Sequence, residues 1–319
     1  MTDSSLPDVA ELERKAGERK SAVAPRPKGP PVWRDMDQQA LDAAYDQSKY
    51  APNQGLVQER RLVNSARARA ALGEPLRLAY GASAIEQLDV YRTRRAGAPV
   101  NVFIHGGAWR NGRSSDFAYL AEIFVHAGVH SVILDFTNID DAGGNLMTMA
   151  RQVRSAVAFV YKNAAGFGGD PDRLYVSGHS SGGHLAGTVV TADWSKDFGL
   201  PADVVKGALL CSGMYDLEPV RLSHRSSYVK FTDEIEQELS ALRHLDRCVC
   251  PLIVGYGTCE TPEFQRQARD FAAALDAAGK PVKLLVGQAY NHFEMLETLA
   301  NPYGLLGRAV LEQMGIPMA

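Results

Sequence analysis

One serine of the chain stands in a pattern that could make it a nucleophile. Ser180 is the central residue of GHSSG at 178–182, which fits G-x-S-x-G, a pattern in which small neighbours allow a serine to sit on a sharp turn between a strand and a helix. The sequence at 173–177 predicts the strand, and the apolar spacing in 181–191 predicts the helix. A glycine-rich turn with an incidental serine is the alternative, which this motif alone leaves open.

A second motif could stabilise the negative charge that develops when a serine attacks a carbonyl group. Residues 105–109 read HGGAW and directly follow a predicted strand. Glycines allow the backbone to turn N–H groups toward such an oxyanion, and the residue after the nucleophile supplies another N–H. Each motif by itself could serve only to form a tight turn. The presence of both motifs, with HGGAW before GHSSG in the chain, favours acyl transfer. The predicted donors of this oxyanion hole are Gly107, Ala108 and Ser181, with Gly106 as a further candidate.

A serine hydroxyl becomes a good nucleophile when a histidine removes its proton. Among the eight histidines, His292 lies just after the last predicted strand, at 282–286, where the chain would return over the carboxyl edge of a parallel sheet. It also has the right place in the chain, since nucleophile, acid and histidine follow one another in that order in enzymes with the G-x-S-x-G turn. We therefore predict that His292 is the base.

Two carboxylates could orient that histidine and stabilise its charged form. Glu260 follows the predicted strand at 252–256, and Asp216 follows the preceding strand at 208–211. Both loops would reach the same edge of the sheet. We expect Glu260 to be the acid, with Asp216 as the alternative. We interpret the adjacent Cys259 as a small buried residue, because nothing supplies it with a base.

Short apolar runs that alternate with longer helical patterns predict the elements that position these residues. The stretches at 77–80 and 88–91 indicate an antiparallel pair, and the clearest helix covers 146–161, where apolar residues recur at spacings of three and four. Such alternation predicts an α/β fold with a mostly parallel central sheet, an antiparallel N-terminal pair and helices on both faces. The later runs expected as strands are 100–104, 129–134, 174–177, 208–211, 252–256 and 282–286.

Taken together, the motifs resemble those of the kynurenine formamidase (arylformamidase) branch of the esterase/lipase superfamily. The resemblance covers about residues 36–315 and implies an α/β-hydrolase fold, with Ser180, Glu260 and His292 as a catalytic triad. The chain departs from the family at one position, because relatives usually carry aspartate where Glu260 stands. The motifs that carry the resemblance are HGGAW at 105–109, GHSSGGHL at 178–185, ETPEF at 260–264 followed by Arg266 and Gln267, and NHFE at 291–294.

Composition divides the chain into three parts. Residues 1–32 are rich in proline, lysine, serine and alanine and are expected to form a flexible arm. Residues 33–72 show helical spacing and are expected to lie over the main domain, as a candidate lid. Residues 73–319 would form the catalytic domain, since a chain of 319 residues with 45% hydrophobic content can bury one large core.

The charge balance and the cysteines limit the partners and the location that we expect. A formal net charge of −3 favours neither nucleic acid nor an anionic membrane surface. No apolar run approaches a membrane span, and the N-terminus lacks the features of a signal peptide. The four cysteines show neither a disulfide framework nor the spacing of a zinc site. We therefore expect a cytoplasmic protein without metal or organic cofactor that acts on a small molecule, and the outer helices offer surface for a homodimer.

The predicted reaction is acyl transfer to water through an acyl-enzyme, with a carboxylic ester or amide as substrate. The resemblance favours a formamide-like or aryl compound, and the candidate substrate contacts are Trp109, Tyr215 and Phe293, for each of which core packing is the alternative. The competing interpretations are a general carboxylesterase, a catabolic enamide or amide hydrolase, acyl transfer to an acceptor other than water, and a non-catalytic binding protein on the same scaffold.

Overall fold

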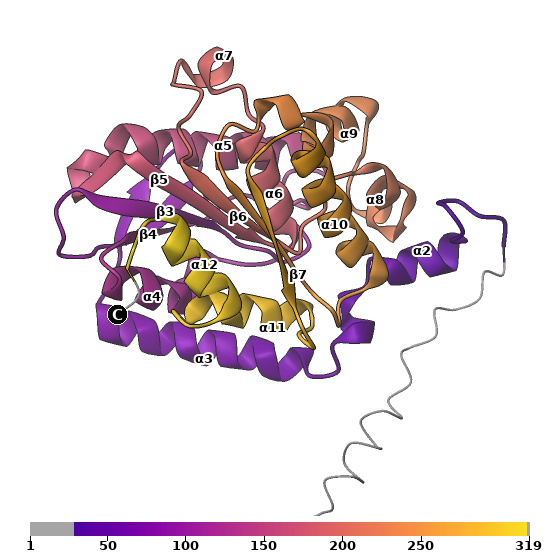
Figure 1. Cartoon of the computed structure of the whole chain (residues 1–319), viewed down its shortest axis with the longest axis horizontal. Helices are drawn as coiled ribbons and strands as arrows, with labels where there is room; N and C mark the ends of the chain where they lie inside the picture. The colour runs from indigo at the N-terminus through magenta and orange to yellow at the C-terminus, as the bar shows by residue number, and fades with distance from the viewer. Residues whose placement is uncertain (1–28, 318–319) are drawn as a thin grey trace, which may run out of the picture.

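The structure, a computed structural model, is built around a sheet of eight strands (Figure 1). It describes residues 29–317, so residues 1–28 of the expected N-terminal arm lie outside the described part. The strand order is β1-β2-β4-β3-β5-β6-β7-β8. The strands are β1 (Leu76–Ala79), β2 (Gln87–Tyr91), β3 (Ala98–Ile104), β4 (His130–Leu134), β5 (Gly169–His179), β6 (Gly207–Cys211), β7 (Leu252–Gly257) and β8 (Val282–Gly287).

The pairing of these strands confirms the mostly parallel sheet with an antiparallel N-terminal pair. β1 pairs antiparallel with β2, and β2 pairs antiparallel with β4. From β4 onward every pair is parallel. Inner strands such as β3 and β4 are buried along their whole length, whereas β1 at the edge is mostly exposed. Burial on both faces explains why the inner strands appear in the sequence as continuous apolar runs.

Helices pack on both faces of the sheet (Figure 1). Within residues 29–317, none of them has both the length and the apolar character needed to cross a membrane. The α-helices are α2 (Gln38–Ala44), α3 (Gln54–Leu72), α4 (Ala121–His126), α5 (Leu146–Asn163), α6 (Ser181–Val190), α7 (Trp194–Phe198), α8 (Glu218–Leu222), α9 (Asp233–Leu239), α10 (Pro262–Ala277), α11 (His292–Glu297) and α12 (Leu305–Gln313). The 3-10 helices are η1 (Gln47–Tyr50), η2 (Ser114–Leu120), η3 (Ala164–Phe167), η4 (His224–Ser227), η5 (Ala241–Arg243), η6 (Leu245–Arg247) and η7 (Thr298–Ala300).

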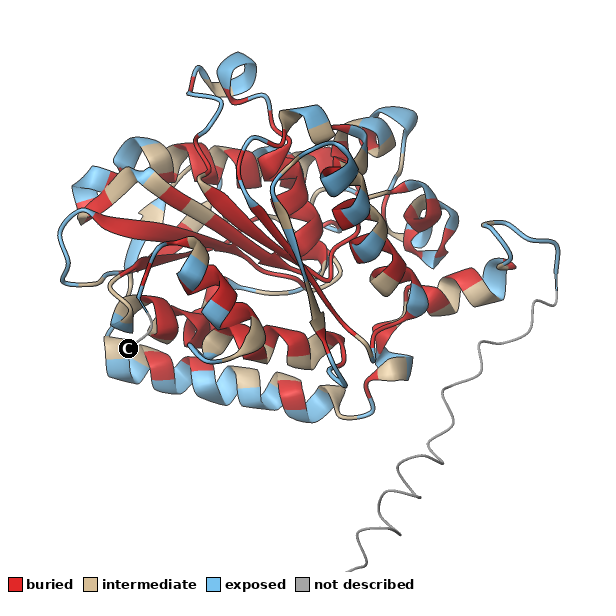
Figure 2. Cartoon of the chain, in the orientation of Figure 1, coloured by how far each residue is buried: buried red, intermediate tan, exposed pale blue. Residues whose placement is uncertain are grey.

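Each face of the sheet has its own apolar core. Successive side chains of a strand point to opposite faces, so Val102 of β3 packs in one core and Phe103 in the other. The first core includes side chains of α5, α6 and α10, and the second includes side chains of η2, α4, α11 and α12. Figure 2 shows the buried sheet between these two layers. The two cores fix the carboxyl ends of the parallel strands, where the predicted site residues lie.

The segment at 33–72 forms α2, η1 and α3, and α3 packs beside η2, α4 and α11 (Figure 1). One stripe of α3, at Val57, Ser65 and Ala68, faces the main domain, and the rest of the helix is largely exposed (Figure 2). The hydroxyl of Ser65 donates to the carbonyl oxygen of Asp116 at 2.8 Å. The N-terminal helices are therefore part of the packed structure.

Candidate active site

Ser180 lies at a sharp turn of the backbone between β5 and α6. Its φ of 59° and ψ of −126° are unusual for a residue with a side chain, and such a conformation costs about 1–3 kcal/mol. Two glycines make the turn possible. A Cβ at Gly178 would lie 2.2 Å from the carbonyl oxygen of Gly182, and a Cβ at Gly182 would lie 2.1 Å from the carbonyl oxygen of Ile104. The G-x-S-x-G pattern therefore has the strand, turn and helix that it predicts.

His292 lies between Ser180 and Glu260, with one ring nitrogen facing each of them. Its Nε2 is 2.8 Å from Ser180 Oγ, and its Nδ1 is 2.8 Å from Glu260 Oε2. An ionised carboxylate only accepts hydrogen bonds, so Nδ1 carries the proton and Nε2 is free to accept the hydroxyl proton of Ser180. His292 and Glu260 are both buried. The arrangement has the geometry of an activated nucleophile, its base and an orienting acid.

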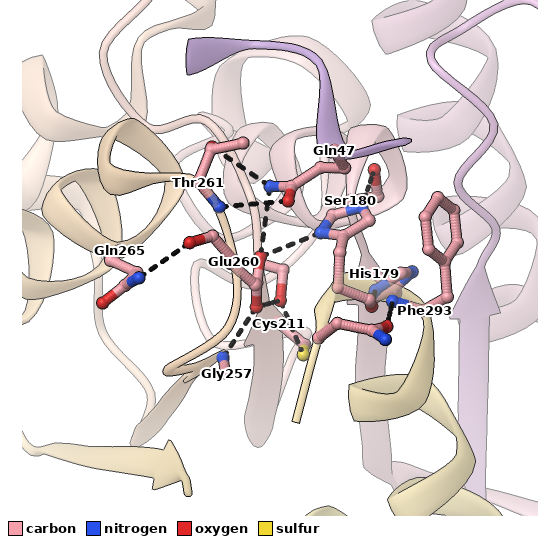
Figure 3. Close-up of polar contacts among 12 residues, drawn as sticks. Gln47, His179, Ser180, Cys211, Gly257, Glu260, Thr261, Gln265 and Phe293 are labelled. Atoms are coloured by element: carbon pink, nitrogen blue, oxygen red, sulfur yellow. Dashed lines mark hydrogen bonds and ion pairs between the residues drawn. The ribbon is translucent and has the colours of Figure 1, made fainter. Parts of the chain in front are cut away.

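Several donors converge on the carboxylate of Glu260 (Figure 3). Its Oε1 accepts hydrogen bonds from the hydroxyl of Ser212 at 2.6 Å and from the N–H of Gly257 at 2.7 Å. Gln47 of η1 reaches the same carboxylate from the N-terminal segment, with its Nε2 3.5 Å from Oε2. A buried charge requires such partners, and here they also fix the direction in which the carboxylate faces His292.

Asp216, the alternative acid, is not brought to the base. Its Oδ1 accepts a hydrogen bond from the N–H of Glu218 at 3.2 Å and lies 3.8 Å from Arg243. Cys259 is exposed, contrary to the expectation of a buried residue. It lies on the turn that follows β7, where its neighbour Glu260 takes the inward position.

A second histidine holds His292 in place. The Nε2–H of His179 donates to the carbonyl oxygen of His292 at 2.8 Å. Burial, reinforced by the proximity of His292, lowers the pKa of His179 well below its usual value, so His179 is a neutral donor. His292 also begins α11, where the Asn291 side chain accepts from the N–H groups of Phe293 and Glu294 at 3.0 and 3.1 Å. This cap fixes the end of the helix that carries the base.

The HGGAW loop packs closely against the nucleophile. A Cβ at Gly106 would lie 2.9 Å from Ser180 Cβ, and one at Gly107, where φ is 127°, would lie 2.1 Å from the carbonyl oxygen of Asn111. Ala108 also has a positive φ, of 54°. Only glycine tolerates the first two positions, which explains the glycine pair of the motif.

Three backbone N–H groups near Ser180 are not used within the fold. Among the hydrogen bonds of residues 29–317, none has the N–H of Gly107, Ala108 or Ser181 as its donor. The N–H of Trp109, by contrast, donates to Ser181 Oγ at 3.1 Å and so connects the loop to α6. A developing oxyanion is an acceptor that free donors of this kind can bind.

Ser180 and His292 line a cavity of about 440 Å³. Its wall includes residues of the HGGAW loop and aromatic side chains, among them Phe117, Tyr228 and Phe293, which suits a small organic molecule. In the described part of the chain, no group of His, Cys, Asp or Glu side chains could hold a metal ion. The N-terminal segment contributes Tyr45, Asp46, Gln47, Ser48, Gln54, Val57, Gln58 and Arg61 to the wall.

Of the three aromatic residues expected at the substrate, the structure brings only Phe293 to this cavity. Trp109 is buried, and its Nε1–H donates to Nδ1 of His184 at 3.3 Å. Tyr215 is buried too, and its hydroxyl donates to the carbonyl oxygen of Leu210 at 3.0 Å. Their placement corrects the expectation, because both rings bury their large surfaces in the core next to the motifs and not in the cavity.

Several residues at the site were missed by the motifs. Gln47 and Ser212 contact the carboxylate of Glu260, and Arg61 lines the cavity. Gln47 and Glu260 are 213 positions apart in the chain, so no local pattern connects them. His179 was also not predicted to act at the site, although its place within the GHSSG motif could have indicated it.

His184 makes the stability of the protein depend on pH. Burial lowers its pKa from 6.5 to about 3. Between these values the unfolded chain binds a proton that the folded chain does not, so the free energy of unfolding falls as the pH decreases below 6.5. At pH 5 the loss from this residue is about 2 kcal/mol. We expect His184→Gln to lose about 2 kcal/mol less than the wild type between pH 7 and pH 5 in urea unfolding.

The control for this experiment is His126→Gln, which changes an exposed histidine. Its loss of stability between the two pH values should match that of the wild type. Equal losses in all three proteins would contradict the prediction, because they would mean that His184 takes up no additional proton on unfolding.

Comparisons with known proteins give the relatives of the chain. The BD-FAE family model matches residues 88–207. A kynurenine formamidase from Danio rerio is 29% identical over 296 residues, which cover 89% of this chain and 98% of that protein. An isoprenylcysteine alpha-carbonyl methylesterase from Arabidopsis thaliana is 24% identical over 68% of this chain and 56% of its own length. The crystal structure of esterase LipW from Mycobacterium marinum matches with a TM-score of 0.65 and 19% identity, over 85% of this chain and 90% of that one.

Proposed function

We propose that this chain, which is an α/β-hydrolase of the esterase and formamidase kind, cleaves a carboxylic ester or amide of a small molecule through an acyl-enzyme on Ser180. One observation carries the proposal. Two contacts of 2.8 Å connect Ser180 Oγ to the Nε2 of His292, and the Nδ1 of His292 to Glu260. A nucleophile, a base and an orienting acid in hydrogen-bonding reach are the requirements of this chemistry.

In this reaction the Nε2 of His292 takes the proton of Ser180 as Oγ attacks the carbonyl carbon, and Glu260 stabilises the imidazolium that forms. His292 then gives the proton to the leaving alcohol or amine, which departs and leaves an ester on Oγ. Water attacks this acyl-enzyme with His292 again as the base, and the carboxylic acid is released. Each half of the reaction therefore uses the same three side chains.

The N–H groups of Gly107, Ala108 and Ser181 bind the oxyanion in both halves of the reaction, with Gly106 giving the loop its close approach to Ser180. This role is supported by the observation that no hydrogen bond within residues 29–317 uses these three N–H groups as donors. A preorganised donor of this kind contributes about a hundred- to a thousandfold to the rate.

A formamide-like or aryl compound is the substrate class that we favour. The support is the similarity to a kynurenine formamidase over most of both chains, together with Phe117, Tyr228 and Phe293 in the wall of the cavity. A general carboxylesterase is the second candidate, favoured by the similarity to a methylesterase. Comparing kcat/KM for formanilide and phenyl acetate separates the two, because the amide and the ester share the phenyl ring.

A fluorophosphonate probe tests the mechanism, because it reacts with a serine that a base has activated. We expect mass spectrometry to find the probe on Ser180 and not on the buried Ser177 or Ser212, and the labelled protein to lose its activity toward p-nitrophenyl acetate. Full activity after complete labelling would contradict the proposal. So would a protein that neither reacts with the probe nor cleaves the ester, which is the behaviour of a non-catalytic binding protein.

We also propose that residues 33–72 cover the substrate. The support is that Tyr45, Gln47, Val57 and Arg61 of this segment belong to the wall of the cavity that contains Ser180. A homodimer and a cytoplasmic location stay predictions from the sequence.

A further inference from the structure

Arg61 of α3 lines the cavity without a carboxylate partner. It is half-buried, its Nε is buried without a hydrogen bond, and its guanidinium carbon lies 4.6 Å from the centre of the Phe117 ring. Within the described residues, no acidic side chain forms an ion pair with it. The preceding residue shows the contrast, because Arg60 binds both oxygens of Glu297 at 2.9 and 2.8 Å. Glu297 is therefore already paired, and Arg61 is not.

Arg225 is a second cation in the wall of the same cavity. It is only 6% exposed. Its guanidinium donates to the hydroxyl of Tyr228 at 2.6 Å and to the carbonyl oxygen of Tyr45 at 3.1 Å, both neutral groups, and its Nε has no partner. A buried charge without a counter-ion is costly, and a bound anion would lower that cost.

The remaining charged groups of the wall do not cancel these two. Arg110 pairs with Asp140 at 3.0 Å outside the wall. Asp46 is the carboxylate of the wall without an ion pair in residues 29–317, and it accepts hydrogen bonds from the N–H and hydroxyl of Ser48. Two cations against one anion leave one positive charge, which matches a substrate with one negative charge.

Arg61 lines the same cavity as Ser180 and His292. Burial and His292 lower the pKa of His179, and Arg61 lowers it further. Burial raises the pKa of Tyr119, and Arg61 opposes that shift. Tyr119 and His179 both line the cavity, and His179 is the residue before the nucleophile. An anion bound at Arg61 would thus belong to the molecule that Ser180 attacks.

We infer that the cavity binds a substrate that carries a carboxylate, with Arg61 as its direct partner and Arg225 adding to the positive potential. The inference deepens the proposed function and rests on it. A planar guanidinium presents paired N–H donors that match a carboxylate, and the contact with the Phe117 ring helps to position the Arg61 guanidinium in the cavity. The selectivity of the enzyme is then for acidic over neutral esters or amides of similar shape.

Two pairs of substrates test this selectivity. 3-Acetoxybenzoate and 3-acetoxybenzamide have nearly the same size and differ by one negative charge, as do the corresponding 4-substituted compounds. The readout is the ratio of kcat/KM for the acid to kcat/KM for the amide. We expect Arg61→Gln to lower this ratio by about ten- to a hundredfold in at least one pair, since hydrogen bonds between charged groups are worth that much. Arg61→Lys should keep part of the preference for the acid, because lysine retains the positive charge but lacks the paired N–H donors of the guanidinium.

The matched control is Arg67→Gln, which removes the same charge from an exposed position of the same helix outside the cavity wall. It should leave the ratio at the value of the wild type. Circular dichroism melting would show that the variants are folded. If neither pair gives a larger fall in Arg61→Gln than in Arg67→Gln, the inference is wrong.

Binding to Ser180→Ala protein separates this inference from the proposed function. Titration calorimetry with benzoate and benzamide needs no turnover, so it reports the anion site alone. We expect benzoate to bind about ten- to a hundredfold more tightly than benzamide, and Arg61→Gln in the Ser180→Ala background to remove the difference. Equal affinity of the two ligands for Ser180→Ala protein would overturn the anion site only, whereas ester cleavage that survives Ser180→Ala would overturn the proposed function.

Discussion

Replacing Ser180 with alanine is expected to lower kcat/KM for p-nitrophenyl acetate by about 10⁴- to 10⁶-fold. The change removes only Oγ, the atom that we propose attacks the carbonyl and that lies 2.8 Å from His292 Nε2. Alanine keeps the Cβ of serine, so the strain at the turn where φ is 59° stays similar and the melting temperature should change little. The activity that remains would come from the oxyanion loop and from substrate binding. Initial rates at several substrate concentrations, with a thermal melt of each protein, measure both effects.

Ser195→Ala is the control for this loss, because it removes a serine hydroxyl from an exposed position of α7. It should keep the kcat/KM of the wild type. A Ser180→Ala protein that retains more than about a tenth of the wild-type activity would exclude Ser180 as the nucleophile, since no interaction outside the covalent step could compensate for its absence.

Glu260→Gln is expected to lower kcat by about 10³- to 10⁴-fold, the second largest effect. Four donors face the two carboxylate oxygens, namely Ser212 and Gly257 at Oε1 and Gln47 and the Nδ1–H of His292 at Oε2. Glutamine has one acceptor oxygen, so its NH₂ group must face one side of this arrangement. If it faces His292, it donates to Nδ1 and stabilises the tautomer whose Nε2 carries a proton and cannot act as the base.

Two further variants decide whether Glu260 is the acid. Asp216→Asn changes the other carboxylate considered for this role, and its kcat should remain within a few-fold of the wild type, because Asp216 lies near Arg243 and not near the base. Glu260→Asp keeps the charge and shortens the side chain by one methylene, so its kcat should fall less than that of Glu260→Gln. A larger loss in Asp216→Asn than in Glu260→Gln would assign the acid to Asp216.

The turn at Ser180 was predictable because its residue pattern is local. Gly178 and Gly182 are required by close backbone approaches within a few residues of the nucleophile or to the neighbouring strand β3. The apolar runs predicted the inner strands for the same kind of reason, since a strand buried on both faces consists mostly of apolar side chains. The parallel sheet then brings the ends of β5, β7 and β8, with Ser180, Glu260 and His292 beyond them, to one edge.

Where a large side chain goes is decided by packing, which the local sequence does not contain. Trp109 lies next to the oxyanion glycines in the chain, yet its ring contacts His184 in the interior. Tyr215 follows β6 toward the active edge, yet its hydroxyl bonds back to Leu210. Burial of aromatic surface competes with exposure to a cavity, and only the assembled core shows which one prevails.

The sequence by itself determined the type of fold, the nucleophile's turn, the glycine loop and the chain order of serine, acid and histidine, because each depends on residue types within a short stretch. Only the tertiary structure decided that Glu260 and not Asp216 faces His292, that Gln47 reaches the same carboxylate, and that Arg61 lies in the cavity unpaired. These contacts join residues that are not neighbours in the chain, and those of Gln47 and Arg61 form only when the helices of residues 33–72 pack onto the sheet domain.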